Sequence, residues 1–277
     1  ALSSYDTTLD LSLEDEVNDE KSFSFDRRGN GSHYTPWDVA NLMTQKIERF
    51  QNLKLLDPAI GTGTFLLSFL QEIPRDELQS IISNQIYGGD KDQHAVWATR
   101  LALWAVGGLE SNLSSSLQKS IICRDYLSGE SEEMWIKNEI NSIVMNPPYV
   151  VHRVGDVNYK SFDCRGCGNI WTLFVERSLN IIRYSENAQM VGIVPATLAN
   201  SVRCESIRQK IIENCNELTM MNIDVVPGYL FRQGKTESTI SNSNKTRDIS
   251  PRVTIFTTKG KGPLNHVKNT NFLRWHN

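Results

Sequence analysis

Short aliphatic runs alternate with stretches of helical periodicity along most of the chain, and this alternation constrains the fold more than any other feature. Strands are expected at residues 53–57, 85–90, 120–125, 142–146 and 189–195. Helices are expected where apolar residues recur every three or four positions, at residues 61–73, 93–106, 170–182 and 204–214. Such strand–helix–strand units favour right-handed crossovers and a mostly parallel sheet with helices on both faces. The sequence therefore predicts an α/β fold.

The two ends of this pattern need separate predictions. Two strand-like runs, residues 219–226 and 252–259, have little helical sequence between them, which predicts an antiparallel hairpin at one edge of the sheet. Near the start, TPWDVANLMTQKIERF predicts a helix with Thr35 as N-cap and Pro36 as its first residue. Trp97 and Trp104, seven residues apart in the second expected helix, are expected to face the core.

Composition is typical of a globular protein rather than a membrane or secreted one. Hydrophobic residues make up 39% of the chain, and no run of about 18 apolar residues could span a bilayer. The acidic start lacks the basic and apolar segments of a secretory signal, and the five cysteines are an odd number at irregular spacing. A reduced, cytoplasmic compartment without a membrane partner is therefore expected.

Cys164 and Cys167 have the spacing of a metal-binding pair, yet two cysteines are not the four ligands of a structural zinc site. The nearest histidine, His152, would supply only a third ligand. A dithiol in a loop is the alternative, and no metal site is predicted.

Polar residues follow four of the expected strands. They are Asp57, Asp90, Asp125 and Asn146. Because ligands of open α/β sheets bind beyond the carboxyl ends of the strands, these four side chains are expected to converge on one crevice.

The turn after the first strand, DPAIGTGTF, indicates which ligand that crevice takes. Gly61 and Gly63 permit a tight turn and close backbone approach, but no third glycine completes a dinucleotide fingerprint. Asp57 at the mouth of the turn would repel a pyrophosphate and suit a cationic, amino-acid-bearing ligand. Asp90 fits an acid that accepts ribose hydroxyls, and Asp125 could accept from an exocyclic amine. Together they describe a nucleoside joined to an amino acid, without phosphate.

With these motifs the chain resembles S-adenosylmethionine-dependent DNA adenine-N6 methyltransferases in which the cofactor motif precedes the catalytic motif. It is similar to the modification subunits of type I restriction systems and to type II and IIG methylases. The resemblance is carried by HYTP, DPAIGTGTF, YGGDKD, CRDYL, NPPY and NIWTLFVERSL, and Ile60 stands where the family often has Cys. It implies a Rossmann-like methyltransferase fold with a seven-stranded, twisted, mostly parallel sheet.

The resemblance also implies a set of cofactor contacts. They are Tyr34, Thr35, Pro36, Asp57, Pro58, Ala59, Gly61, Gly63, Thr64, Phe65, Asp90, Lys91, Asp125, Tyr126, Asn146, Pro148 and Phe174.

The catalytic motif is Asn146, Pro147, Pro148 and Tyr149. The lone pair of the adenine amine is delocalised into the ring, so hydrogen bonds to the Asn146 side-chain oxygen and the Pro147 carbonyl would make the nitrogen more nucleophilic. The two prolines stiffen the loop, and Tyr149 offers a flat face for stacking a flipped base. Phe231 resembles the second stacking aromatic, although a polar insert at about 237–250 follows it and simple hydrophobic packing is the alternative.

The resemblance implies transfer of a methyl group from S-adenosyl-L-methionine to N6 of a flipped-out adenine in double-stranded DNA, within a restriction-modification or phage-defence system. A specificity subunit, or a fused recognition or nuclease domain, would be the partner. Two alternatives stay open: methylation of a protein glutamine or an rRNA adenine, and a cofactor-binding subunit that is inactive alone. HYTP and the late run RVTIFTTKG match the DNA group.

Three segments are expected on this basis. Residues 1–32 are expected to be an acidic, polar lead-in or the end of a missing N-terminal domain. Residues 33–262 are the methyltransferase catalytic domain, and residues 263–277 begin a truncated or absent target-recognition region.

Overall fold

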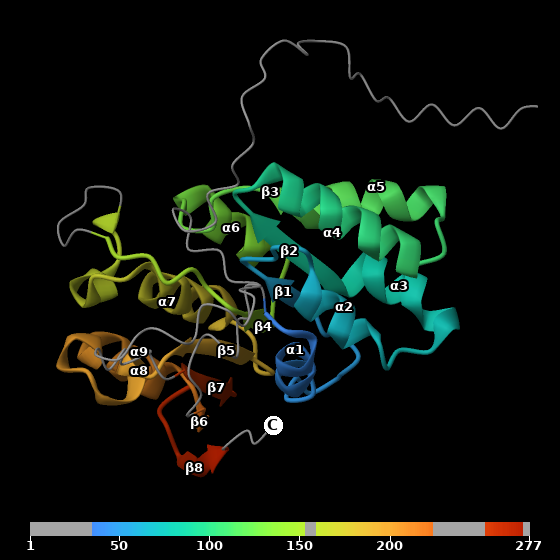
Figure 1. The fold of residues 1–277 in the computed structure, drawn as a ribbon. Helices are drawn as coiled ribbons and strands as arrows, with labels where there is room; N and C mark the ends of the chain where they lie inside the picture. Colours follow the sequence, from blue (N-terminus) through green and yellow to red (C-terminus); the bar gives the residue numbers. More distant parts are fainter. Residues whose placement is uncertain (1–34, 153–158, 224–252, 274–277) are drawn as a thin grey trace, which may run out of the picture.

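An eight-stranded sheet runs through the centre of the structure, with helices packed on both of its faces (Figure 1). This computed structural model describes residues 35–152, 159–223 and 253–273. Tyr34, Phe231, the lead-in at 1–32 and the polar insert at 237–250 lie outside the described residues.

The strands are β1 (Leu55–Asp57), β2 (Ile86–Asp90), β3 (Ile121–Cys123), β4 (Ser142–Met145), β5 (Gln189–Pro195), β6 (Glu217–Ile223), β7 (Val253–Lys259) and β8 (His266–Leu273). The longer helices are α1 (Trp37–Thr44), α2 (Thr64–Leu70), α3 (Arg75–Gln85), α4 (Gln93–Val106), α5 (Ser111–Ser120), α6 (Gly129–Lys137), α7 (Ile170–Ile182) and α9 (Glu205–Asn214). The short elements are η2 (Asp163–Cys167), α8 (Thr197–Asn200) and η3 (Val202–Cys204).

The strand order is β3-β2-β1-β4-β5-β7-β6-β8. Neighbours from β3 to β5 are parallel, and β7 is inserted antiparallel between β5 and β6. The α/β fold class, mostly parallel with an antiparallel β6–β7 pair, is thereby confirmed. The difference is β8, which adds an eighth strand parallel to β6 from within the segment 263–277.

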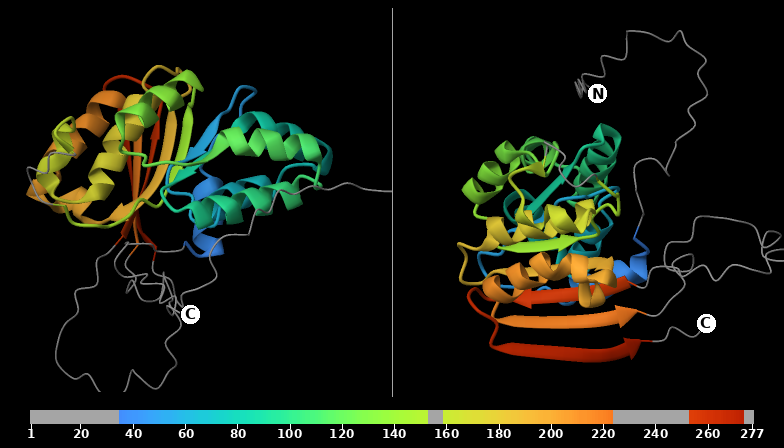
Figure 2. Two further views of the ribbon diagram at one scale, coloured as in Figure 1. Left: turned by 90° about the horizontal axis from the view of Figure 1, so that it is seen from above. Right: turned by 90° about the vertical axis from the view of Figure 1, so that its left-hand side faces the viewer.

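Successive residues of the central strands pack into two separate cores, because side chains alternate between the faces of a sheet. Leu55 and Val144 belong to the core under α1–α5, whereas Leu56, Ile143 and Met145 belong to the core under α6, α7 and α9. Figure 2 shows the sheet between these two helical layers. Both faces of the parallel strands are buried, which explains their continuous apolar runs.

The start of α1 corrects one prediction. Pro36 has ψ 148° and is the N-cap, so the helix begins at Trp37, and no side chain caps it. Thr35 is therefore not the N-cap. Its hydroxyl instead accepts a hydrogen bond from the side-chain amide of Asn146, 111 residues away.

The prediction that Trp97 faces the core is wrong. Trp97 is 57% exposed, whereas the buried face of α4 consists of Val96, Thr99 and Leu103. Trp104 is half-buried and donates its indole N–H to the Glu110 carbonyl at 2.9 Å. Since α4 is apolar around most of its circumference, spacing identifies residues on one face but not which face is buried.

Among the longer helices of the described residues, α3, α5 and α6 were not predicted. They are mainly polar, and α3 buries only Ile82. The start of α6 follows from Ser128, whose hydroxyl accepts the Ser131 N–H at 3.3 Å. This helix connects β3 to β4 and so completes the crossover between them.

Candidate functional site

Four polar residues lie at the carboxyl edge of the sheet. Asp57 ends β1 and Asp90 ends β2, Asp125 lies two residues beyond β3, and Asn146 directly follows β4. The strands that carry them are consecutive in the sheet and parallel, so all four residues lie at the same edge. The expectation that they follow parallel strand ends is met.

Asp57 is fully buried. Its Oδ1 accepts the Ala59 N–H at 3.1 Å, whereas its buried Oδ2 has no hydrogen-bond partner within the described part of the chain. Burial raises the pKa of Asp57 to about 8, the bond from Ala59 opposes this, and the negative charge of Asp90 adds to it. An unpartnered carboxylate oxygen at this position is suited to a cationic donor from a ligand.

The turn after β1 depends on Gly63. Its φ of +80° lies in the left-handed region, and a Cβ there would be 2.8 Å from Cγ2 of Thr99. The Thr99 hydroxyl also donates to the Gly61 carbonyl at 3.1 Å, which ties the turn to α4. Pro58 and Phe65 are buried, whereas Ala59, Gly61 and Thr64 are partly exposed.

Ile60 anchors the turn after β1 in the core. Its side chain is buried in the core under α1–α5, and a Cβ on Gly88 would lie 2.4 Å from its Cγ2.

Asp90 is oriented by two backbone donors. Its Oδ2 accepts the Gly61 N–H and its Oδ1 accepts the Asp92 N–H, each at 3.0 Å. The half-buried carboxylate therefore faces the glycine turn, while the neighbouring Lys91 is exposed.

Beyond β3, an exposed acid lies next to two buried aromatic residues. The Asp125 Oδ1 accepts the Leu127 N–H at 2.9 Å. The rings of Tyr126 and Phe174 are 5.0 Å apart at 36°, and both are buried. The Tyr126 hydroxyl lies 2.9 Å from that of Ser178, and burial raises the pKa of Tyr126 above its usual value.

The loop after β4 carries the predicted catalytic residues. The Asn146 Nδ2 donates to Thr35 Oγ1 at 3.1 Å, which orients the amide of a half-buried side chain. Pro147 is buried and Pro148 half-buried. The Tyr149 hydroxyl donates to the Ile193 carbonyl on β5 at 2.9 Å, and burial of this hydroxyl raises the pKa of Tyr149.

The end of this loop is attached to the start of α7 through the backbone. The Ile170 N–H donates to the Val150 carbonyl at 2.8 Å, the His152 N–H donates to the Gly168 carbonyl at 3.1 Å, and Val151 pairs with Asn169. The loop is therefore held at its start by β4 and at its end by the start of α7.

Two contacts were not predicted from the sequence. Thr35 was expected at the cofactor and at the helix cap, but its hydrogen bond with Asn146 was not expected, and neither was the hydrogen bond from Tyr149 to β5. Neither contact has a local signal, because each joins residues far apart in the chain.

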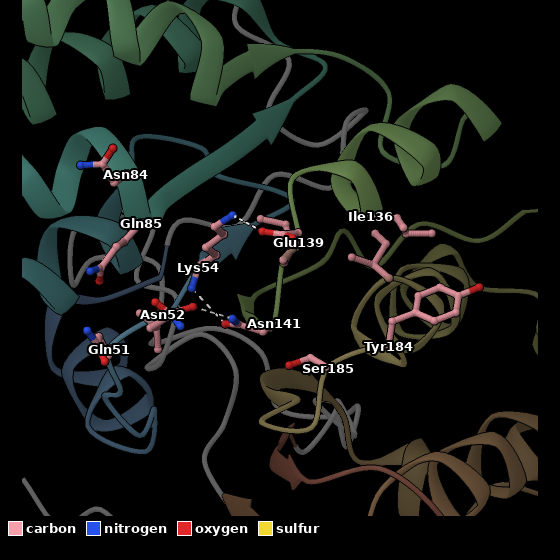
Figure 3. Close-up of a pocket in the computed structure, with 13 residues that line it drawn as sticks. Gln51, Asn52, Lys54, Asn84, Gln85, Ile136, Glu139, Asn141, Tyr184 and Ser185 are labelled. Atoms are coloured by element: carbon pink, nitrogen blue, oxygen red, sulfur yellow. Dashed lines mark hydrogen bonds and ion pairs between the residues drawn. The ribbon is translucent and has the colours of Figure 1, made fainter.

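A cavity of about 660 Å³ lies at the opposite edge of the sheet (Figure 3). Its lining includes Lys54, just before β1, and Asn141, just before β4. Lys54 forms an ion pair with Glu139 at 2.8 Å there. None of the predicted site residues within the described ranges lines this cavity, and the four strand-end residues lie instead at the carboxyl edge.

Within the described ranges, no group of three or more His, Cys, Asp and Glu side chains could bind a metal ion. The Cys167 sulfur contacts that of Cys204 at 2.8 Å, and Cys164 is buried. No helix of the described parts is long and apolar enough to cross a bilayer.

Comparison with known proteins identifies similar chains. The chain is 26% identical over 197 residues to the Modification methylase CviBIII of Paramecium bursaria Chlorella virus NC1A, a match that covers 70% of this chain and 45% of that protein. The chain spans less than half the length of the curated relatives that it matches.

Two solved structures share the fold. A cryo-EM structure of a DrdV–DNA complex has a TM-score of 0.65 at 13% identity, covering 90% of this chain and 28% of the other. The crystal structure of the Type I restriction enzyme EcoKI M protein has a TM-score of 0.61 at 15% identity, covering 86% of this chain and 47% of the other. The model of the N-6 DNA Methylase family matches residues 21–277. The family resemblance predicted from the motifs is therefore confirmed, and the chain belongs to the N-6 DNA Methylase family.

Proposed function

We propose that the chain transfers a methyl group from S-adenosylmethionine to N6 of a flipped-out adenine in double-stranded DNA. The observation that carries this proposal is the adjacency of β1 and β4. Because these strands are parallel neighbours, the buried acid Asp57 and the oriented amide of Asn146 lie at adjacent strand ends. A cofactor subsite and a subsite for the target amine would thus be next to each other.

The residues of the carboxyl edge fit this cofactor. S-adenosylmethionine, when bound, supplies an electrophilic methyl group on a sulfonium. The unpartnered Asp57 Oδ2 would accept from its ammonium group, and Asp90 would accept from its ribose hydroxyls. Asp125 would accept from its exocyclic amine, with Tyr126 and Phe174 beside the ring. The remaining members of the predicted set, Tyr34, Thr35, Pro36 and the turn residues, stay predictions.

Asn146 and Pro147 would act on the target adenine. The Asn146 Oδ1 and the Pro147 carbonyl would accept the two hydrogens of the N6 amine and direct its lone pair at the methyl group. The nitrogen would form its bond to the methyl carbon as the bond from that carbon to sulfur breaks and a neutral thioether leaves, and the nitrogen would afterwards lose one proton to water. Tyr149 would stack on the flipped base, and its bond to Ile193 fixes the ring beforehand. The role of Phe231 as a second stacking residue stays a prediction.

Transfer of labelled methyl groups to DNA, followed by nucleoside analysis, tests the proposal. We expect N6-methyladenine, which Asn146→Ala abolishes while binding of S-adenosylhomocysteine is kept. Label in a protein glutamine or in rRNA instead would favour the alternative enzyme class. Cofactor binding with no methyl transfer to DNA, even after a recognition subunit is added, would favour a subunit that is inactive alone.

The partners follow from the same proposal. We propose that recognition of a DNA sequence involves a specificity subunit or a fused recognition or nuclease domain. We propose a role in restriction-modification or phage defence in the cytoplasm. Copurification with the flanking gene products, and methylation of only one sequence context, are the expected results.

A further inference from the structure

Two neighbouring residues of opposite charge, Glu176 and Arg177, are buried in the middle of α7. They are only 2% and 3% exposed. Burying a charge costs several kcal/mol unless it is paired and hydrogen-bonded. The partners of each side chain therefore explain why it is buried.

Arg177 contacts the turn that follows Asp125 and Tyr126. Its Nη2 donates to the Leu127 carbonyl at 2.9 Å and its Nη1 to the Ser128 carbonyl at 3.0 Å. The same guanidinium pairs with Glu132 of α6 at 2.8 Å and lies 4.7 Å from the centre of the Phe162 ring. Two carbonyls of one turn are thus fixed by a single planar group.

The peptide groups of Leu127 connect Arg177 to Asp125. The Leu127 N–H donates to Asp125 Oδ1 at 2.9 Å, and the Leu127 carbonyl accepts from Arg177. A guanidinium that holds Leu127 therefore also determines the orientation of the Asp125 carboxylate. The turn is closed further by the Ser131 hydroxyl, which donates to the Asp125 carbonyl at 2.7 Å.

Other residues of α7 contact the same turn. Phe174, one helical turn before Ser178, packs against the Tyr126 ring, and the Ser178 hydroxyl lies within hydrogen-bond distance of the Tyr126 hydroxyl. Three residues of one helix face, Phe174, Arg177 and Ser178, thus position the segment Asp125–Ser128.

We propose that Arg177 is a positioning residue that makes the cofactor subsite selective for adenine. The inference rests on the proposed function, because it takes Asp125 as the acceptor for the exocyclic amine. Arg177 itself touches no cofactor atom. Through Leu127 it holds the Asp125 carboxylate at the angle at which an amine donor is accepted and a carbonyl oxygen is rejected.

Glu176 provides a matched control on the same helix. Its carboxylate accepts the N–H groups of Asp163 and Cys164 at 3.0 and 2.9 Å, and it pairs with Lys210 at 3.0 Å. These contacts belong to η2 and α9, not to the turn at 125–128. Glu176→Gln therefore perturbs α7 to a comparable depth without touching the turn.

The test compares two ligands that differ at the six-position of the purine and at the adjacent N1. S-adenosylhomocysteine has an exocyclic amine and an unprotonated N1 there, whereas S-inosylhomocysteine has a carbonyl and an N1–H. Calorimetry would measure both affinities for the full chain and for its variants Arg177→Met, Arg177→Lys and Glu176→Gln. We expect the unchanged protein to prefer the adenosyl ligand by about 10- to 100-fold, the effect of one hydrogen bond to a charged group.

In Arg177→Met we expect this preference to fall at least about fivefold, with the affinity for the inosyl ligand nearly unchanged. Arg177→Lys keeps the charge but cannot present the planar pair of donors. Its preference for the adenosyl ligand should therefore lie between those of the unchanged protein and Arg177→Met. Glu176→Gln keeps the full preference. If Arg177→Met shows no cooperative unfolding transition on heating, the ligand preference of Arg177→Lys tests the inference instead.

The outcomes separate the inference from the function it rests on. Equal loss of both ligands in the Arg177 variants, or the same loss of preference in Glu176→Gln, would show a packing role and overturn the inference alone. If the unchanged protein binds neither ligand, the proposed cofactor is wrong, and the inference fails with it.

Discussion

The buried carboxyl of Asp57 predicts that cofactor affinity depends on pH in a defined direction. Its pKa is raised from 3.8 to about 8, mainly because the side chain is fully buried. Each pKa unit corresponds to about 1.4 kcal/mol, so ionising this group in the empty, folded protein costs on the order of 6 kcal/mol more than ionising an aspartate in water. A protonated Asp57 cannot form an ion pair with the ammonium group of a ligand.

The expected consequence is tighter binding at higher pH. Below the raised pKa, S-adenosylhomocysteine must displace the proton from Asp57, so its affinity should rise by up to about tenfold per pH unit between about pH 5.5 and pH 7.5. Calorimetry in two buffers of different ionisation enthalpy should show release of close to one proton per ligand. A flat affinity over this range, without proton release, would refute the assignment of the ammonium subsite to Asp57.

Stability provides an independent measure of the same group. A carboxyl whose pKa is raised by folding contributes stability that is fully present below its unfolded pKa of 3.8 and is lost as the pH rises through about 8. Asp57→Asn removes this dependence. We therefore expect the melting temperature of the variant to rise relative to that of the unchanged protein as the pH increases from about 5 to about 8. Proton release on ligand binding should disappear in the variant. A difference in melting temperature between the two proteins that stays the same at every pH would contradict the raised pKa.

Substitutions at three further positions have expected outcomes. Gly63→Ala places a Cβ at φ +80° and 2.8 Å from a threonine methyl of α4, so unfolding should become easier by about 1–3 kcal/mol in chemical denaturation. Tyr149→Phe removes the hydroxyl that donates to the Ile193 carbonyl and should lower stability by about 1 kcal/mol with most methyl transfer retained, whereas Tyr149→Ala should lose transfer. Equal loss in both Tyr149 variants would contradict a stacking role. Thr35→Val removes the acceptor for the Asn146 amide, so kcat should fall by up to about tenfold and Thr35→Ser should restore it.

Several elements could be predicted to the residue from local sequence. The predicted ranges 93–106, 170–182 and 189–195 coincide with α4, α7 and β5. The two helices are rich in apolar residues and have polar N-caps, Asp92 and Asn169, which accept backbone N–H groups at their starts. The helices α3, α5 and α6 were missed because they are mainly polar and contain few apolar residues, and packing in the tertiary structure stabilises them instead.

The candidate site was predictable as a set of strand ends but not as a set of contacts. Apolar runs that stop at Asp57, Asp90 and Asn146 are visible in the sequence, and the structure has these residues at the carboxyl ends of β1, β2 and β4. The bond between Asn146 and Thr35 spans 111 positions, and that between Arg177 and Leu127 spans 50. No pattern within either segment indicates its partner.

The sequence by itself determined the α/β fold class, the order of most elements and the residues that end the central strands, because periodicity, capping and glycine turns act over a few neighbouring residues. Only the tertiary structure decided which face of each helix is buried, as the exposure of Trp97 shows, and that β8 extends the sheet next to β6. It also decided that Asp57 is a fully buried acid, one of whose oxygens has no hydrogen-bond partner among the residues that the structure describes. These properties depend on what packs against a residue, and that is set by chain segments far from it in sequence.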